Sequence, residues 1–69
     1  MDLTYSNHAI DMMQLRHISF DEIETCVKDH DIYCTDKKGN PKYRKSIEGR
    51  DIKVVLSKQN KNHVITVED

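Results

Sequence analysis

The chain has 69 residues, of which 36% are hydrophobic and 33% charged, and its formal net charge is −1 at pH 7. This length supports one small domain with a limited core, so we expect residues 1–69 to form a single domain. The longest apolar run, residues 54–56, is far too short to cross a bilayer, and the first five residues lack the pattern of a secretion signal. We therefore expect a cytoplasmic protein, with no membrane contact and with its two cysteines as free thiols.

The charge is divided unevenly along the chain. Residues 1–36 carry eight acidic and two basic side chains, whereas residues 37–69 carry four acidic and nine basic ones. Such a split is compatible with one basic surface that faces a polyanion, and equally with the chance distribution of charge in a small protein. The isoelectric point near 6.4 is low for a dedicated nucleic-acid binder.

The first residues of the chain predict a short strand and a helix. Residues 2–5 are partly β-prone and predict the strand. Ser6 is a typical N-cap for a helix over residues 7–17. The side chains that recur there at helical spacing are Ala9, Met12, Met13 and Arg16.

A second helix begins at a capping box, Ser19-x-x-Glu22, and runs to about Asp29. Ile18, which precedes the cap, is placed to pack on Ile23. The residues that this helix is expected to bury are Ile23, Cys26 and Val27.

From residue 31 onward the hydrophobic period becomes alternating, which predicts strands over residues 32–35, 42–47, 52–57 and 63–67. Polar turns separate them. The predicted fold is therefore α+β, with two N-terminal helices packed on one face of a three- to four-stranded antiparallel sheet, in the order β-α-α-β-β-β.

Alternation also predicts which side chains share a face of this sheet. In the strand over 52–57, the apolar residues Ile52, Val54 and Leu56 point one way and Lys53 points the other. In the last strand we expect Ile65 and Val67 to face the helices and Thr66 to face away. Arg44 can join Lys53 and Thr66, so one open face of the sheet would hold all three.

Several short motifs resemble a known family. They are Tyr5-Ser-Asn-His8-Ala9, Arg16 followed by Ile18-Ser-x-x-Glu-Ile23, Tyr43-Arg44, Gly49-Arg50-x-Ile52-Lys53-Val54-Val55, and Val64-Ile65-Thr66-Val67. Their order resembles the bacterial domain-of-unknown-function 4258 family over nearly the whole chain. That family is similar in architecture to the RelE/ParE/BrnT-like toxin superfamily, whose active members are metal-independent ribonucleases. This chain has Met12 where the family usually has a second arginine, four residues after the histidine.

This resemblance and the residue chemistry together suggest a site for RNA. Cleavage without a metal needs a base for the 2′-hydroxyl, cations at the phosphate and an acid for the leaving oxygen. The predicted catalytic residues are His8, as base or acid, with Arg44 and Lys53 as the cations. The predicted RNA- or phosphate-binding residues are Arg16, Tyr43 and Thr66. We expect no cofactor and no metal, and an acidic antitoxin-like protein is the expected partner.

Each of these residues also has an ordinary explanation. A histidine at a helix start is often a surface residue, and Lys53 fits the exposed side of an alternating strand. The same fold could therefore be a non-catalytic protein-interaction module, and the sequence leaves both alternatives open. Cys26-x-x-x-His30-x-x-x-Cys34 resembles part of a zinc site, but no fourth ligand is specified, so we expect Cys26 to be a core residue instead.

Overall fold

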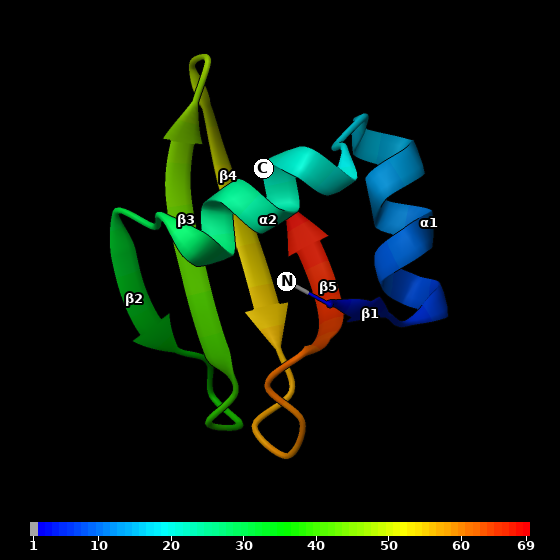
Figure 1. Cartoon of the computed structure of the whole chain (residues 1–69), viewed down its shortest axis with the longest axis vertical. Coiled ribbons are helices and arrows are strands. Elements are labelled where there is room, and N and C mark those ends of the chain that lie inside the picture. The colour runs from blue at the N-terminus through cyan, green and yellow to red at the C-terminus, as the bar shows by residue number, and fades with distance from the viewer. Residues whose placement is uncertain (1) are drawn as a thin grey trace.

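A computed structural model describes residues 2–69 of the chain. The elements follow one another as two helices enclosed between strands (Figure 1). In chain order they are β1 (Thr4–Tyr5), α1 (Asn7–Arg16), α2 (Phe20–Lys28), β2 (Ile32–Thr35), β3 (Pro41–Ile47), β4 (Arg50–Leu56) and β5 (His63–Glu68). The α+β class and the positions of both helices agree with the prediction.

The sheet has five strands in the order β1-β5-β4-β3-β2. The strands β2 to β5 form an antiparallel meander, while β1 pairs with β5 in the parallel direction. The predicted sheet of three or four antiparallel strands was therefore wrong in its strand count and in being purely antiparallel. The cause is the pairing of β1, only two residues long, with a strand almost sixty positions away, which no local pattern reveals.

Both helices begin at the predicted caps. The Ser6 hydroxyl accepts a hydrogen bond from the Ala9 amide at 3.0 Å. The Ser19 hydroxyl accepts from the Glu22 amide at 3.1 Å, and the Glu22 carboxylate accepts from the Ser19 amide at 2.9 Å, which completes the capping box. These bonds satisfy N–H groups that have no partner within a helix. The turn between the helices is tight because His17 ends α1 in the left-handed conformation, with φ of 55°.

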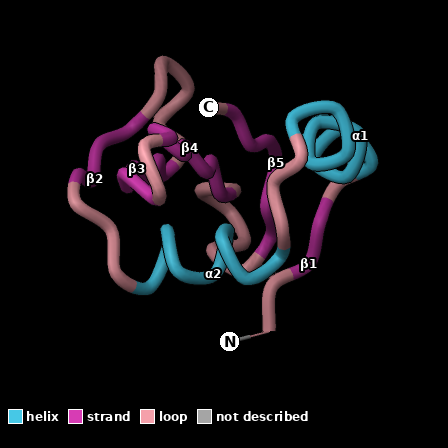
Figure 2. Tube along the Cα trace, turned by 90° about the horizontal axis from the view of Figure 1, so that it is seen from above, coloured by secondary structure: helices cyan, strands magenta, loops and turns pink. Residues whose placement is uncertain are grey.

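The core lies between the helices and one face of the sheet. Figure 2 shows α2 along one side of the sheet and α1 beside β5; α2 packs on β3 and β4, and α1 packs on β5. The largest side chains with almost no exposure are Ile23, Ile52, Leu56, Val54, Val64, Val67 and Cys26. The predicted inward faces of α2 and β4 are confirmed.

The inward face of β5 differs from the prediction. Val64 and Val67 are both fully buried, and Ile65 is only partly so. Leu56 lies opposite Val64 while Val55 lies opposite Thr66, so Ile65 is an extra residue in the ladder. Such a β-bulge changes the alternation of the strand that contains it, which strict alternation cannot anticipate. Between residues 2 and 69, neither helix is long and apolar enough to cross a membrane.

Candidate functional site

The face of the sheet opposite α2, here called the open face, carries the three strand residues of the predicted site. Arg44 on β3 lies directly opposite Lys53 on β4. Thr66 on β5 lies opposite Val55, which shares a face with Lys53 because the two are two residues apart on one strand. The structure therefore brings Arg44, Lys53 and Thr66 onto one surface, as strand alternation indicates.

The cations of the open face are already paired with carboxylates of the chain. The Arg44 Nη2 atom lies 2.6 Å from Asp51 Oδ2, and the Lys53 Nζ atom lies 3.7 Å from the same oxygen. Lys42 Nζ reaches Glu68 Oε1 at 3.5 Å. Asp51 is thus shared by the two predicted phosphate-binding cations, a role that sequence reasoning missed because it assigned Asp51 to a turn.

Arg44 combines an ion pair to Asp51 with one donor that has no partner between residues 2 and 69. The hydrogen bond from Arg44 holds the pKa of Asp51 below its ordinary value, so Asp51 is ionised at neutral pH. The Nε atom of Arg44 is buried and has no hydrogen-bond partner among the described residues. A hollow of about 180 Å³ lies beside the guanidinium, lined by Asp31, Ile32, Arg44, Lys45, Ser46 and Asp51. Arg44 therefore has an unsatisfied Nε donor, which is buried, and a hollow beside its guanidinium.

His8 lies in the first turn of α1 and is exposed. Its side chain makes no hydrogen bond to any other residue in the range 2–69. Ile10 and Gln14 line the side of α1 that faces α2, and the helical period puts His8 and Met12 on another side of the helix, away from α2. Met12 is half-buried and packs on the core, so the position four residues after His8 supplies an apolar side chain and not a second basic one.

Arg16 does not join the open face. Its Nη1 atom lies 3.3 Å from Asp69 Oδ1, at the far end of α1 from His8. Asp69 also accepts hydrogen bonds from Arg50, at 3.1 Å from Nε and 2.8 Å from Nη2. These bonds, with the bond from Arg50 as the main cause, keep the pKa of Asp69 below its ordinary value. Arg16 therefore belongs to an ion-pair cluster that closes the end of the fold.

Arg50 is the residue at the centre of this cluster, and sequence reasoning placed it in a turn. Its guanidinium donates to the carbonyl oxygens of Arg16 at 2.6 Å and of His17 at 3.1 Å. It also lies 3.7 Å from Glu22, the acidic member of the capping box. Alternation with the buried Ile52 would have put Arg50 on the helix side of the sheet, but no sequence signal specifies its partners.

Tyr43 is also separated from Arg44, because neighbouring residues of a strand point to opposite faces. It lies opposite the buried Val54 and is half-buried on the helix side of the sheet. Its ring centroid is 4.8 Å from that of His30 and 5.2 Å from that of Tyr33. Burial, and to a smaller extent Tyr33, raises the pKa of the Tyr43 hydroxyl. Tyr43 thus forms part of an aromatic cluster at the β2 edge.

The two cysteines differ sharply in environment, which leads to a prediction for their reactivity. Cys26 is fully buried, and its Sγ atom lies 3.5 Å from the carbonyl oxygens of Tyr43 and Ile52. Burial raises the pKa of the Cys26 thiol to about 11, whereas Cys34 is exposed on β2. We expect a thiol reagent to modify Cys34 quickly and Cys26 only after unfolding, since the thiolate is the reactive form. Mass spectrometry of protein labelled in dilute solution at pH 8 checks this, and rapid labelling of both cysteines would contradict it.

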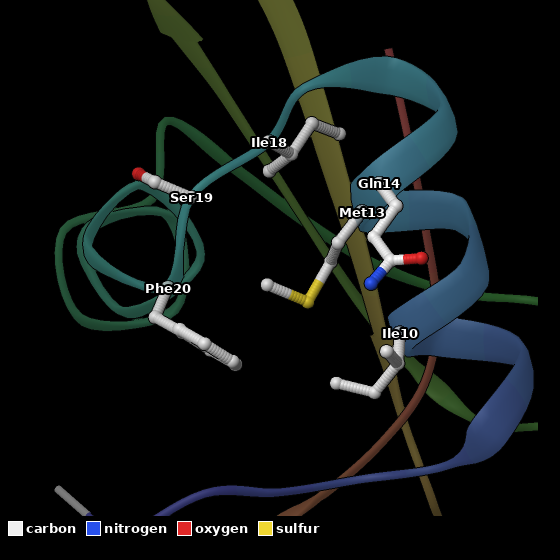
Figure 3. A pocket seen from close by; sticks show the side chains of 6 residues that line it. All are labelled: Ile10, Met13, Gln14, Ile18, Ser19 and Phe20. Atoms are coloured by element: carbon white, nitrogen blue, oxygen red, sulfur yellow. The ribbon is translucent and has the colours of Figure 1, made fainter.

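A second hollow separates the two helices. It measures about 310 Å³ and is lined by Ile10, Met13, Gln14, Ile18, Ser19 and Phe20. Figure 3 shows Ile10 and Met13 of α1 and Phe20 of α2 directed into it. Phe20 is 51% exposed, and its ring packs edge-on against Tyr5 with centroids 4.9 Å apart. An exposed aromatic side chain beside an apolar hollow is typical of a contact surface for another molecule.

Comparison with known proteins identifies a family for almost the entire chain. The family described as "Domain of unknown function (DUF4258)" matches residues 5–69, a range that contains both helices, β2 to β5 and every residue of the predicted site. No curated protein and no solved structure matches the chain. The similarity to the RelE/ParE/BrnT-like superfamily stays a prediction. The chain belongs to the DUF4258 family.

Proposed function

We propose that the open face binds the phosphate backbone of RNA, with Arg44 and Lys53 as the contacts to phosphate. The observation that carries this proposal is the direct cross-strand pairing of Arg44 with Lys53. Like charges in opposite positions of a sheet are unfavourable unless an anion lies between them. Asp51 fills that role within the chain, and a phosphate can replace it because the Asp51 side chain is 48% exposed.

Thr66 and the unpaired Arg44 Nε support the same proposal. Arginine presents several donors in a planar fork that fits a phosphate, and the buried Nε of Arg44 has no partner within residues 2–69, so a phosphate would satisfy it once the side chains that cover it move. Thr66 adds a hydroxyl to the same surface. In this proposal the open face uses an arginine fork, an ammonium group and a hydroxyl, which together are suited to one or two backbone phosphates.

We further propose that His8 transfers a proton in metal-independent cleavage of the bound RNA. Imidazole titrates near neutral pH, and the first turn of α1 presents backbone N–H groups that favour a phosphate. The 2′-hydroxyl would lose its proton to His8 and attack the adjacent phosphorus, while Arg44 and Lys53 would neutralise the phosphorane. The bond between phosphorus and the 5′-oxygen then breaks, the 5′-oxygen takes a proton from solvent water, and a 2′,3′-cyclic phosphate remains.

Binding is tested by an amide NMR titration with a short single-stranded RNA at several salt concentrations. We expect shifts at Arg44, Lys53 and Thr66 that weaken as salt rises, because backbone binding releases counterions. The control is Lys61→Ala, which removes one positive charge from a polar turn outside the open face, so the shifts at Arg44, Lys53 and Thr66 should persist in it. Shifts confined to residues 37–42, or no shifts at all, would overturn the proposal.

Cleavage is tested with a labelled RNA in the presence of a metal chelator. We expect His8→Ala to abolish cleavage while RNA binding persists, because His8 acts on the proton and not on the phosphate charge. His17→Asn is the control, since it removes a histidine from the other end of α1 at a left-handed position that asparagine tolerates. Binding without cleavage in the unmodified protein would limit the function to RNA binding.

The hollow between α1 and α2 favours a second candidate, a non-catalytic protein-interaction module. It is apolar, and Phe20 is exposed beside it. In the toxin-like alternative, an acidic antitoxin-like segment would instead cover the open face and compete with RNA. A Phe20→Ser variant that loses a partner while RNA shifts stay unchanged would favour the module. Displacement of RNA by an acidic peptide would favour the antitoxin-like partner.

A further inference from the structure

The outer edge of β2 is an unprotected strand edge. All four residues of β2, Ile32–Thr35, are exposed, and no strand within residues 2–69 pairs with their outer side (Figure 1). Ile32 is 49% and Tyr33 53% exposed, and they are two of the four exposed large hydrophobic residues between residues 2 and 69. Edge strands are kept from further pairing by a very short length or a bulge, and otherwise by a charged residue such as lysine or by a proline. The sequence Ile-Tyr-Cys-Thr has neither.

The hydrogen bonds of β2 identify which backbone groups point outward. The Asp36 amide donates to the Asn40 carbonyl at 2.9 Å, and these residues continue the register in which Thr35 lies opposite Pro41. Hydrogen-bonded pairs alternate along an antiparallel ladder, so Cys34 and Ile32 bond to β3. Pro41 has no N–H group, which fits its place in a pair without hydrogen bonds. Tyr33 and Thr35 therefore direct their N–H and C=O groups away from β3.

We propose that two copies of the chain associate through antiparallel pairing of their β2 strands about a twofold axis. In the register that we propose, Tyr33 of each copy lies opposite Thr35 of the other, and each such pair exchanges both N–H···O bonds. Cys34 then lies on the axis opposite its own copy, in a pair without hydrogen bonds. The two sheets join into one continuous sheet, in which Tyr33 lies opposite Thr35 and diagonal to Tyr33 of the other copy, and Ile32 lies opposite Asp36 and diagonal to Cys34.

Backbone alternation and charge together select this register over its neighbours. The register places Asp31 of each copy opposite Lys37 of the other, and both residues are exposed. A shift by one residue in either direction would misalign the outward backbone groups, whether it brings Asp31 opposite Asp36 or opposite Lys38. A shift by two would set Tyr33 opposite Tyr33 and remove the charge pairing. A strand with complementary ends of this kind matches a second copy of itself better than an unrelated strand.

Hydrogen exchange of the full chain, kept reduced, tests the interface directly. We expect the Tyr33 and Thr35 amides to exchange freely in dilute solution and to become protected as concentration approaches the millimolar range. The Ile32 and Cys34 amides should stay protected at every concentration, because they bond to β3. Sedimentation equilibrium on the same samples should show a rise from monomer to dimer mass. A monomer at all concentrations, or a dimer in which Tyr33 and Thr35 stay unprotected, would overturn the proposal.

Oxidative crosslinking tests the register. Cα atoms in such a cross-strand pair lie about 4.5 Å apart, within the range of a disulfide. With Cys26→Ser as background, we expect copper-catalysed air oxidation to link Cys34 to Cys34. Moving the cysteine by one position, with Cys34→Ser and Thr35→Cys, should suppress the link because these Cα atoms are diagonal neighbours about 7–8 Å apart. Equal crosslinking by both variants would reject the register.

A final variant removes the interface and keeps the fold. Thr35→Pro deletes an N–H that faces outward and that β3 does not use, so we expect a folded monomer at every concentration. Thr35→Lys, which adds a charge to the edge without changing the backbone, should act in the same direction. A folded Thr35→Pro or Thr35→Lys protein that still dimerises as strongly as the parent would contradict the proposal.

Discussion

Replacing Arg50 with alanine is expected to lower the free energy of unfolding by about 2 kcal/mol, the scale of hydrogen bonds that involve a charged group. Carbonyl groups at the end of a helix have no donors within it, and Arg50 satisfies those of Arg16 and His17. The same guanidinium holds Asp69 beside α1. A domain of this size has a total stability on the order of 5 kcal/mol, so the loss should be obvious in urea denaturation followed by circular dichroism.

Arg44→Ala is the matched control for this experiment. It also removes an arginine that is paired with an aspartate, but its partner Asp51 is half exposed and no helix end depends on it. A surface pair of this kind is worth less than about 1 kcal/mol. Arg50→Lys should lower the free energy of unfolding by an amount between those of Arg50→Ala and Arg44→Ala, since one ammonium group cannot reproduce the several donors of the guanidinium. In Arg50→Ala the pKa of Asp69 should also rise toward its ordinary value, which NMR can follow. Equal stability of the Arg50→Ala and Arg44→Ala variants would contradict the role given to Arg50.

Asp51→Asn and Lys53→Ala are expected to change RNA affinity in opposite directions. Asparagine at position 51 removes the carboxylate that competes with phosphate for Arg44 and Lys53, and we expect affinity to rise about fivefold at low salt. Lys53→Ala removes a phosphate contact, and we expect affinity to fall about tenfold and the salt slope to decrease by about 0.7. Fluorescence anisotropy of a labelled RNA across several salt concentrations measures both effects.

The pair of variants separates a specific site from general charge effects. Glu68→Gln is the control for Asp51→Asn with respect to Arg44, because it removes the same charge from the open face beside Lys42 and opposite Lys53 but leaves the Arg44–Asp51 pair intact. The low pKa of Asp51, caused chiefly by the bond from Arg44, means that the competing carboxylate is ionised from pH 5 to 8 and that its effect should not vary in that range. If Asp51→Asn and Glu68→Gln raised affinity equally, RNA would be responding to net charge, and the proposed contact with Arg44 would be wrong.

Local patterns were enough to predict the parts of the fold that depend on neighbours in sequence. The capping box at Ser19 and Glu22 was predicted correctly because both bonds join groups three residues apart. The inward set Ile52, Val54 and Leu56 follows from the two-residue period of a strand. The same period places Arg44 and Lys53 on the open face. The sequence by itself therefore determined the helices, most of the strands and the residues that could form a site.

Tertiary structure decided everything that depends on how distant segments meet. The bulge at Ile65, which brings Val64 rather than Ile65 into the core, depends on the register between β4 and β5. Arg50 and Asp51 looked like turn residues, and only folding brings Arg50 to the end of α1 and sets Asp51 between Arg44 and Lys53. Contacts between distant segments also hold Arg16 beside Asp69 and Tyr43 beside His30, away from the open face. Periodicity specifies which way a side chain points, whereas its partners are set by contacts between segments that are remote in sequence.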